Sequence, residues 1–252
     1  MEKLTVIIPT YNEELHIKEA IASALFADEI IIIDSYSTDK TLTIAEKFSV
    51  KIIQREYKYS ASQKNWAIPQ AKHDWVFILD ADERITFELK QEIIDILKNP
   101  PQKISGYWIY RKNHFIGRPV KYSGWQNDKV IRLFKKENCR YEDKRVHSEI
   151  QTTGKIGFLK HKIDHYSFSS VKQYVQKLNN YAIWQAKDYD LKTGKLNLFH
   201  FFIKPFWRFT KHYFVQQGFR DGIPGFTISF LQAYAVLMRY VNLWIIRHHE
   251  KS

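Results

Sequence analysis

Short apolar runs alternate with amphipathic stretches over the first hundred residues of the chain. The runs at residues 4–9, 30–33 and 75–79 are almost uninterrupted, which is typical of strands covered on both faces of a parallel sheet. After the first run, apolar residues recur from Ile17 at positions i, i+4, i+7 and i+8, the spacing of a helix with one buried face. We therefore expect a doubly wound, mostly parallel sheet with helices on both faces. The alternation also predicts a strand at 50–54 and helices ending near residue 48, at 62–70 and at 87–97.

The polar segments after the first two strands carry helix-start signals. Asn12 is a good N-cap for the first helix, because its side chain can accept a hydrogen bond from a free backbone N–H group. Glu13 and Glu14 would lie in the first turn, where they complement the helix dipole. Asp34–Asp39 predicts the corresponding loop and cap after the second strand.

The pattern changes after Pro101, where Asn99-Pro100-Pro101 ends the last of these helices. Strand-like segments separated by polar loops follow, and they suit an antiparallel edge of the sheet. The rest of the chain has helical patterning. We expect a sheet domain of residues 1–168 and a helical C-terminal extension of residues 169–252. The expected strands are 106–115, 129–136 and 156–165, and the expected helices are about 169–190, 196–217 and 223–247.

Composition narrows the class of protein. The 252 residues are 44% apolar and 15% aromatic, which excludes a disordered chain and provides for a sizeable core. One cysteine, Cys139, excludes a disulfide framework and a thiolate metal cluster, and we expect a cytoplasmic protein without a signal peptide. The formal net charge of +12 favours nucleic acid, an anionic membrane surface or phosphorylated substrates as partners.

The strongest chemical signal is an acidic cluster that follows the apolar run at residues 75–79. Asp80, Asp82 and Glu83 would lie at the carboxyl edge of the sheet, where open α/β sheets bind their ligands. Three carboxylates repel one another unless they share a cation. Mg²⁺ or Mn²⁺ suits such oxygen ligands, so a divalent metal is the expected cofactor. A solvated turn with Asp82 as a helix N-cap is the alternative.

Three ordered motifs resemble those of the family 2 inverting glycosyltransferases, which have the GT-A fold. They are Val6–Glu14 (VIIPTYNEE), Ile33–Asp39 (IDSYSTD) and Leu79–Glu83 (LDADE). The resemblance covers about residues 4–165. Three further segments are similar to bacterial transferases that build the lipopolysaccharide core, including its β-1,4-glucosyltransferases: Gly124-Trp125, Arg132-Leu133-Phe134 and Val146-His147-Ser148-Glu149.

The resemblance implies a nucleotide-sugar site. Asp34 would accept a hydrogen bond from the base, usually uracil, and Lys64 would approach the diphosphate or the base. Asp80 would lie near the ribose and the metal, and Asp82 would coordinate the metal that bridges the diphosphate. Tyr36 replaces the usual glycine of the second motif, so a different backbone turn is expected there. Thr10, Tyr11 and Glu13 would line the nucleotide pocket.

An inverting transfer needs a base that takes the proton of the acceptor hydroxyl. Glu149 is the expected base and Asp128 the second candidate. A surface strand residue without a catalytic role is the alternative for Glu149. His147 would be a supporting or metal ligand, or simply a hydrogen-bonded polar residue. His161 and His165 are interpreted as structural, because on one strand they would lie too far apart to chelate.

The C-terminal part mixes aromatic and basic side chains. From residue 196 to 252 it has seven Lys and Arg and two acids, a net charge of +5, which suits a helix lying peripherally on an anionic membrane, at its cytoplasmic face. Packing on the sheet domain is the alternative for residues 226–246. The uncharged stretch Ile223–Met238 has 16 residues, fewer than the roughly 20 of a spanning helix, so no transmembrane span is expected.

The resemblance implies metal-dependent, inverting transfer of one sugar from a nucleoside-diphosphate sugar, expected to be UDP-linked, to a saccharide or glycolipid of the bacterial envelope. Processive members carry Gln-x-x-Arg-Trp, whereas Gln217-Gly218-Phe219-Arg220 is followed by Asp221, which favours a non-processive enzyme. A basic nucleic-acid-binding protein is one alternative, although no RNA-binding or zinc-finger pattern is present. A nucleotidyltransferase usually has a glycine-rich loop after its first strand, and Pro9–Glu14 has no glycine. A sugar-nucleotide-binding module without catalysis is the remaining alternative.

Overall fold

The computed structural model describes residues 1–144 and 149–249. The chain forms two compact units, and each is considered by itself. The first consists of Met1–Lys112 with Asp128–His165, and the second consists of Asn113–Asn127 with Tyr166–Ser252. The first unit contains the sheet, and the second is mostly helical.

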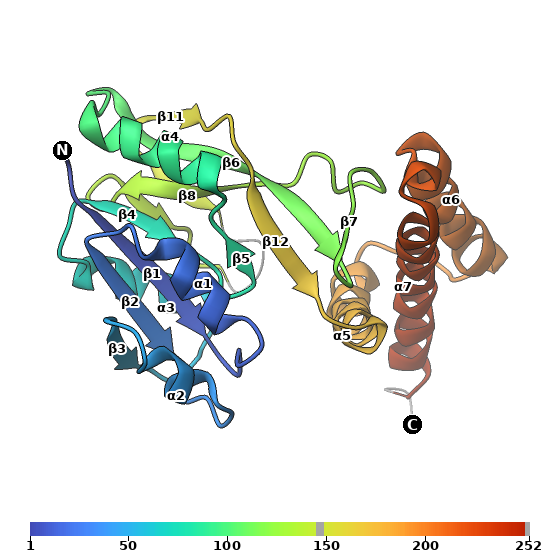
Figure 1. The fold of residues 1–252 in the computed structure, drawn as a ribbon. Coiled ribbons are helices and arrows are strands. Elements are labelled where there is room, and N and C mark those ends of the chain that lie inside the picture. The colour runs from blue at the N-terminus through green and yellow to red at the C-terminus, as the bar shows by residue number, and fades with distance from the viewer. Residues whose placement is uncertain (145–148, 250–252) are drawn as a thin grey trace. The chain divides into compact units, whose positions relative to one another are not determined.

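Four parallel strands form the core of the first unit (Figure 1). They are β1 (Leu4–Thr10), β2 (Glu29–Asp34), β3 (Lys51–Gln54) and β4 (Trp75–Ile78), in the spatial order β3-β2-β1-β4. The chain therefore moves outward from β1 to β3 on one side and returns to β4 on the other. This reversal creates a switch point between β1 and β4, where the loops after the two strands diverge and leave a crevice.

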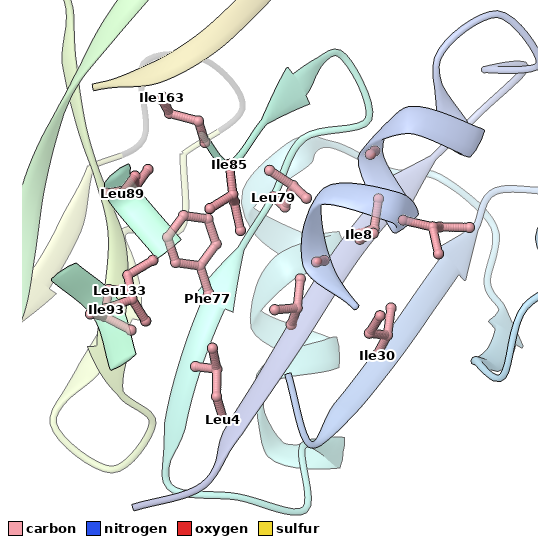
Figure 2. Close-up of a cluster of buried hydrophobic side chains, with 14 of the residues drawn as sticks. Leu4, Ile8, Ile30, Phe77, Leu79, Ile85, Leu89, Ile93, Leu133 and Ile163 are labelled. Carbon is pink, nitrogen blue, oxygen red and sulfur yellow. The ribbon is translucent and has the colours of Figure 1, made fainter. Parts of the chain in front are cut away.

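Alternate residues of these strands pack against helices on opposite faces of the sheet. Ile8 and Ile32 belong to the cluster under α1 (Ile17–Ala24), α2 (Thr41–Ala45) and α4 (Phe87–Lys98). Figure 2 shows part of this cluster, in which Phe77 of β4 lies near Leu89 and Ile85. Ile7 and Ile31, Val76 and Ile78 pack on the other face with α3 (Ser60–Ala67) and the short helix Ile68–Gln70. Each fully buried side chain of this size contributes roughly 1.5–3 kcal/mol.

Antiparallel strands extend the sheet beyond β4, as the segments after Pro101 predict. β8 (Lys129–Lys135) pairs with β4, and β6 (Ile104–Phe115) pairs with β8. The expected strand at 156–165 is two strands, β11 (Lys155–Phe158) and β12 (Ile163–Phe168). The chain leaves the strand conformation between them because the Glu92 carboxylate of α4 accepts hydrogen bonds from the N–H groups of Lys160 and His161, at 2.9 and 3.0 Å. The small strands are β5 (Glu83–Arg84), β7 (Arg118–Pro119), β9 (Cys139–Tyr141) and β10 (Ile150–Thr152).

The first helix begins later than Asn12 predicts. α1 starts at Ile17, and Asn12 has a left-handed backbone with φ of 54°. The reason is a connection between the loops after β1 and β2 that uses the same polar groups. Asn12 Oδ1 accepts from the Thr38 N–H at 2.8 Å, and the N–H groups of Glu13 and Asn12 donate to hydroxyls of Thr41 and Ser37 at 2.7 and 2.9 Å.

The second unit is built from long helices with an aromatic core. α5 (Val171–Asp190) is capped by Ser170, whose hydroxyl accepts from the Gln173 N–H at 3.2 Å. α7 (Gly222–His249) packs along α5, and Gln232 of α7 donates to the Tyr174 hydroxyl at 2.9 Å. Within the described residues, no helix has the length and apolarity needed to cross a bilayer. The segment between α5 and α7 is irregular. π-Helical turns at Phe199–Ile203 and Lys211–Val215 flank α6 (Lys204–Thr210), and a 3₁₀ turn covers Gly218–Asp221.

Candidate functional site

Residues from three elements meet at the switch point of the sheet. Thr10 ends β1, Asp80 follows β4, and Lys64 lies on α3. Lys64 Nζ lies 2.9 Å from Asp80 Oδ1, and both side chains line a pocket of about 130 Å³ together with Thr10 and Tyr11. Tyr57 also lines this pocket, with an exposed ring that no sequence motif indicated. The pocket joins Thr10 and Tyr11 of the first motif, Asp80 of the third motif and Lys64, whereas Glu13, which was also expected there, is not among its described lining residues.

Asp34 organises the loop that borders this pocket. Its carboxylate is fully buried at the end of β2, and it accepts hydrogen bonds from the Ser37 N–H and the Gln54 amide, both at 3.0 Å. The Ser37 hydroxyl donates to the same carboxylate at 2.5 Å. Tyr36 between them has φ of 60°, a left-handed conformation that favours glycine. The turn therefore keeps the backbone for which glycine is suited, and tyrosine occupies it because Asp34 holds both sides of the loop.

A second, larger pocket of about 250 Å³ also borders Asp80. Asp80 and Lys64 line it together with Arg132 of β8, Arg111 of β6 and Glu149. Glu149 is exposed and lies just before β10, so the structure brings the expected base to the same pocket as the third motif. The remaining segment of that predicted motif, including His147, lies outside the described residues.

Two arginines that the sequence analysis assigned no role neutralise the acidic cluster. Arg132 Nη2 lies 2.7 Å from Glu83 Oε1 and also forms an ion pair with Asp80. Arg111 Nε lies 2.8 Å from the same Glu83 oxygen, and its Nη1 lies 3.4 Å from Asp128 Oδ1. Burial alone would raise the pKa of Asp80, but Arg132, Lys64 and Arg111 hold it well below its ordinary value. Asp80 is therefore a permanent anion inside a cationic frame.

This arrangement separates the two candidate bases. Asp128 is half-buried and paired with Arg111, whereas Glu149 is exposed in the pocket. One sequence signal could have indicated Arg132: it interrupts the apolar run Val130–Phe134 of a strand, and an arginine buried there needs partners. Arg111 has no comparable local signal.

His165 lies against Asp82. Its Nε2 is 3.3 Å from Asp82 Oδ2, because β12 pairs with β5 in a register that places His165 opposite Glu83. Burial works to raise the pKa of Asp82, but the hydrogen bond and charge of His165 outweigh it and lower the pKa. The sequence predicts a structural role for His165, and the structure places it in contact with Asp82. His161 lies outside β12 and next to Glu92.

The pKa of Glu13 is shifted in the opposite direction from that of Asp82. Burial, then the charges of Asp82, Asp39 and Asp80, raise the pKa of Glu13 to about 7. The Glu13 N–H donates to the Thr41 hydroxyl, and this hydrogen bond fixes the position of Glu13 in the loop after β1. Glu13 is thus near half protonation at neutral pH, whereas Asp80 and Asp82 are ionised.

The sequence of residues 5–159 matches the family model described as glycosyl transferase family 2. This chain belongs to glycosyltransferase family 2. An uncharacterized glycosyltransferase of Rickettsia felis is 33% identical, over 96% of this chain and 90% of the relative. The lipopolysaccharide core biosynthesis glycosyltransferase LpsC of Rhizobium meliloti is 26% identical, over 94% of this chain and 93% of the relative.

A solved structure supports the fold. Residues 1–349 of Staphylococcus aureus TarS, crystallised in complex with UDP-GlcNAc, align over 99% of this chain and 91% of that chain, with a TM-score of 0.50 and 17% identity. The predicted GT-A fold, with its mostly parallel sheet, antiparallel members and C-terminal helices, is confirmed. The expected enzyme class, a glycosyltransferase, is confirmed as well.

The site of this family 2 glycosyltransferase can bind an anion and move a proton. Lys64, Arg111 and Arg132 supply positive charge beside Asp80, and Glu149 supplies an accessible carboxylate. Among the described residues, no three His, Cys, Asp or Glu side chains converge as a complete metal cage. Asp82 and His165 nevertheless place one oxygen and one nitrogen donor together.

Proposed function

We propose that this glycosyltransferase transfers one sugar, with inversion and without processivity, from a UDP-linked sugar to a saccharide or glycolipid of the bacterial envelope, such as the lipopolysaccharide core. The observation that carries the proposal is the convergence of Lys64, Asp80 and Glu149 on one pocket at the switch point of the sheet. The likeness to LpsC supports the acceptor class, and the likeness to TarS bound to UDP-GlcNAc supports the donor class.

The donor nucleotide occupies the pocket lined by Thr10 and Tyr11. The exposed rings of Tyr11 and Tyr57 offer apolar faces for the base and ribose. Asp34 acts on the base through the loop it holds, since its own carboxylate is buried. Lys64 lines both this pocket and the larger one, which supports a contact between its ammonium group and the diphosphate that connects nucleotide and sugar.

A divalent metal fits the donor set beside the diphosphate. Mg²⁺ and Mn²⁺ accept carboxylate oxygen, and Mg²⁺ commonly takes only one or two carboxylates and completes its shell with substrate phosphate and water. Asp82 would be the oxygen ligand, and His165 Nε2 would be a second donor. When bound, such an ion supplies positive charge that stabilises the departing nucleoside diphosphate. Asp80 is already neutralised by Lys64 and Arg132, so it contributes less to metal binding than Asp82.

Glu149 acts as the base. It removes the proton of the acceptor hydroxyl as that oxygen attacks the anomeric carbon and the bond to the diphosphate breaks, so that one displacement inverts the configuration. Its exposure leaves room for an acceptor hydroxyl, whereas Asp128 is already paired with Arg111. Lys64 and Lys144 line the same pocket as Glu149, and their positive charge is compatible with this role.

The test is transfer from a panel of UDP-sugars to lipopolysaccharide core fragments, measured with Mn²⁺ by release of UDP. Glu149→Gln keeps the shape of the side chain but cannot accept a proton, and turnover should fall by about 10²–10⁴-fold with donor affinity nearly unchanged. Asp128→Asn is the matched control, and it should retain far more turnover. The reverse result would transfer the role of base to Asp128, and no UDP release with any donor would contradict the proposed substrate class.

A further inference from the structure

A row of four aromatic rings, two of them exposed and two half-buried, crosses the second unit. Tyr213, Phe209, Phe226 and Phe230 form the row, which we call the aromatic face. Ring centroids are 5.3 Å apart for Phe209 and Tyr213, 5.9 Å for Phe209 and Phe226, and 6.3 Å for Phe226 and Phe230. Phe226 and Phe230 are 49% and 57% exposed. Large apolar groups exposed side by side indicate an interaction surface rather than ordinary surface composition.

Two hollows, one apolar and one mixed, border the first half of α7. One, of about 380 Å³, is lined by Phe226 and Phe230 with Phe206 of α6. The other, of about 720 Å³, is lined by Ile223 and Thr227 with Ile116, and also by Arg118 and Asp221. Ile223 is 82% exposed and Phe206 is 68% exposed. The aromatic face therefore continues on both sides into concave surface.

Ile116 adds an unusual feature to the second hollow. It forms, with Gly117, the two-residue turn between β6 and β7, in which Phe115 pairs with Arg118. Both turn residues have positive φ, 51° for Ile116 and 71° for Gly117. Such a turn suits Asn-Gly, and a β-branched residue is strained there. An exposed isoleucine in a strained turn points to a function that needs an apolar side chain at that tip.

Most of the net positive charge of the protein lies in the same unit. Residues 113–127 and 166–252 contain 14 Lys and Arg and 4 Asp and Glu, which gives this unit +10 of the net charge of +12. Arg118, Lys121 and Lys211 are exposed. The carboxylate of Asp221 accepts hydrogen bonds from the N–H groups of Lys121 and Tyr122, at 3.0 and 2.9 Å. This acidic side chain is therefore already hydrogen-bonded within the unit.

We infer that the second unit docks on an anionic phospholipid bilayer, with the aromatic face and Ile116 inserted at the headgroup boundary. Aromatic rings interleaved with basic side chains are what an anionic interface recognises. The +10 charge opposes a second copy of this chain as the occupant, because like charges would be brought together. Exposed phenylalanine rings and the aliphatic tip at Ile116 suit the acyl chains of a bilayer better than the phosphates of a nucleic acid. The inference goes beyond the proposed sugar transfer and is tested without any substrate.

The experiment is flotation of the full chain with vesicles of phosphatidylcholine mixed with phosphatidylglycerol, and with vesicles of phosphatidylcholine alone. Binding is measured from about 0.1 M salt, where the screening length is about 10 Å, to about 1 M, where it is about 3 Å. The charge variant is Arg118→Gln with Lys121→Gln and Lys211→Gln. Its control removes three exposed lysines of the first unit: Lys3→Gln, Lys47→Gln and Lys51→Gln. Lys204 is left intact because it donates to the Tyr240 hydroxyl at 2.8 Å.

Two apolar variants test insertion. Phe226→Ser with Phe230→Ser removes half of the aromatic face, and Phe87→Ser with Phe158→Ser is the control, since both of those rings are exposed on the first unit. Ile116→Asn is the cleaner variant. Asparagine tolerates the left-handed backbone, so loss of binding by this variant cannot be attributed to loss of folding, and melting temperatures verify this.

The chain should float with anionic vesicles at low salt and keep a salt-resistant fraction. The charge variant should lose binding at low salt by about 10-fold or more, since each basic side chain near an anionic surface contributes on the order of five-fold. Ile116→Asn and the phenylalanine variant should lose the salt-resistant fraction, and both controls should bind as the unchanged chain does. Absence of flotation, equal flotation with neutral vesicles, or equal losses in the controls would overturn the inference. Self-association that Phe226→Ser with Phe230→Ser abolishes would instead identify a second copy as the occupant.

Discussion

Replacing Arg132 with methionine tests how much the ion-pair network at the site contributes to stability. The Arg132 side chain is 3% exposed, and its Nη2 contacts both Glu83 and Asp80. Breaking a buried ion pair by removing one partner costs about 3–5 kcal/mol, because the remaining charge is buried without compensation. Here Glu83 keeps Arg111 at 2.8 Å, and Asp80 keeps Lys64 at 2.9 Å. We therefore expect the lower end of the range, a loss of about 3 kcal/mol in the free energy of unfolding.

Denaturation followed by near-ultraviolet circular dichroism measures this loss. For a unit of this size, a loss of about 3 kcal/mol lowers the melting temperature by about 6–12 °C. Lys98→Met is the control, because Lys98 forms an exposed pair with Asp95 at 3.1 Å, and such pairs contribute about 0–1 kcal/mol.

A double variant separates lost pairing from lost packing. Arg132→Met with Glu83→Gln removes the buried carboxylate together with its partner, so its cost should be smaller than the sum of the two single costs by about 1–3 kcal/mol. A loss for Arg132→Met no larger than that for Lys98→Met, or strict additivity in the double variant, would refute the argument that these charges depend on one another.

Two further predictions concern the ligands of the site, and a third concerns the pH dependence of stability. Asp82→Asn should abolish Mn²⁺-dependent transfer and Mn²⁺ binding in calorimetry while circular dichroism remains unchanged, and full activity of the native enzyme in EDTA would exclude a metal role. Asp34→Ala should weaken UDP binding by about 1–3 kcal/mol, because the loop that its hydrogen bonds hold is released; equal calorimetric affinity would remove Asp34 from the donor site. Glu13 has a pKa of about 7 in the folded chain and a lower pKa when the chain is unfolded. Because the folded chain binds this proton more tightly, the free energy of unfolding falls as pH rises from about 4.5 to about 7. Glu13→Gln should therefore stabilise the protein by about 2–3 kcal/mol at pH 8 and little at pH 4, and a stability difference that does not change with pH would contradict the assignment.

Ile116 offers a linked stability prediction. Asparagine fits the left-handed backbone that Ile116 adopts with φ of 51°, and the left-handed conformation costs other residues roughly 1–2 kcal/mol. Ile116→Asn should therefore raise the free energy of unfolding by about 1 kcal/mol, measured by denaturant titration. A stabilised variant that no longer binds vesicles would mean that the natural residue is retained for docking at the expense of stability.

The order of strands and helices in the first hundred residues could be predicted because periodicity is a local property. The apolar runs ending at Pro9, Ile33 and Leu79 needed burial on two faces, and the sheet buries them as expected. The acidic cluster at Asp80 was placed at the carboxyl edge for the same reason, since it follows a buried strand. Asn12 was predicted wrongly, because its side chain is used by a loop 26 residues away, a contact that no local window contains.

The surroundings of the acidic cluster were decided only by tertiary structure. Arg132 and Arg111 reach Asp80 and Glu83 because β8 joins the sheet beside β4, and β6 joins beside β8. His165 reaches Asp82 because β12 pairs with β5. Those partners are 28 to 83 residues apart in the chain, and their strand patterns would suit several neighbours equally well. Which strands become neighbours depends on how the whole sheet buries its two faces, so the cations at this site follow from global packing, while the carboxylates follow from the local sequence.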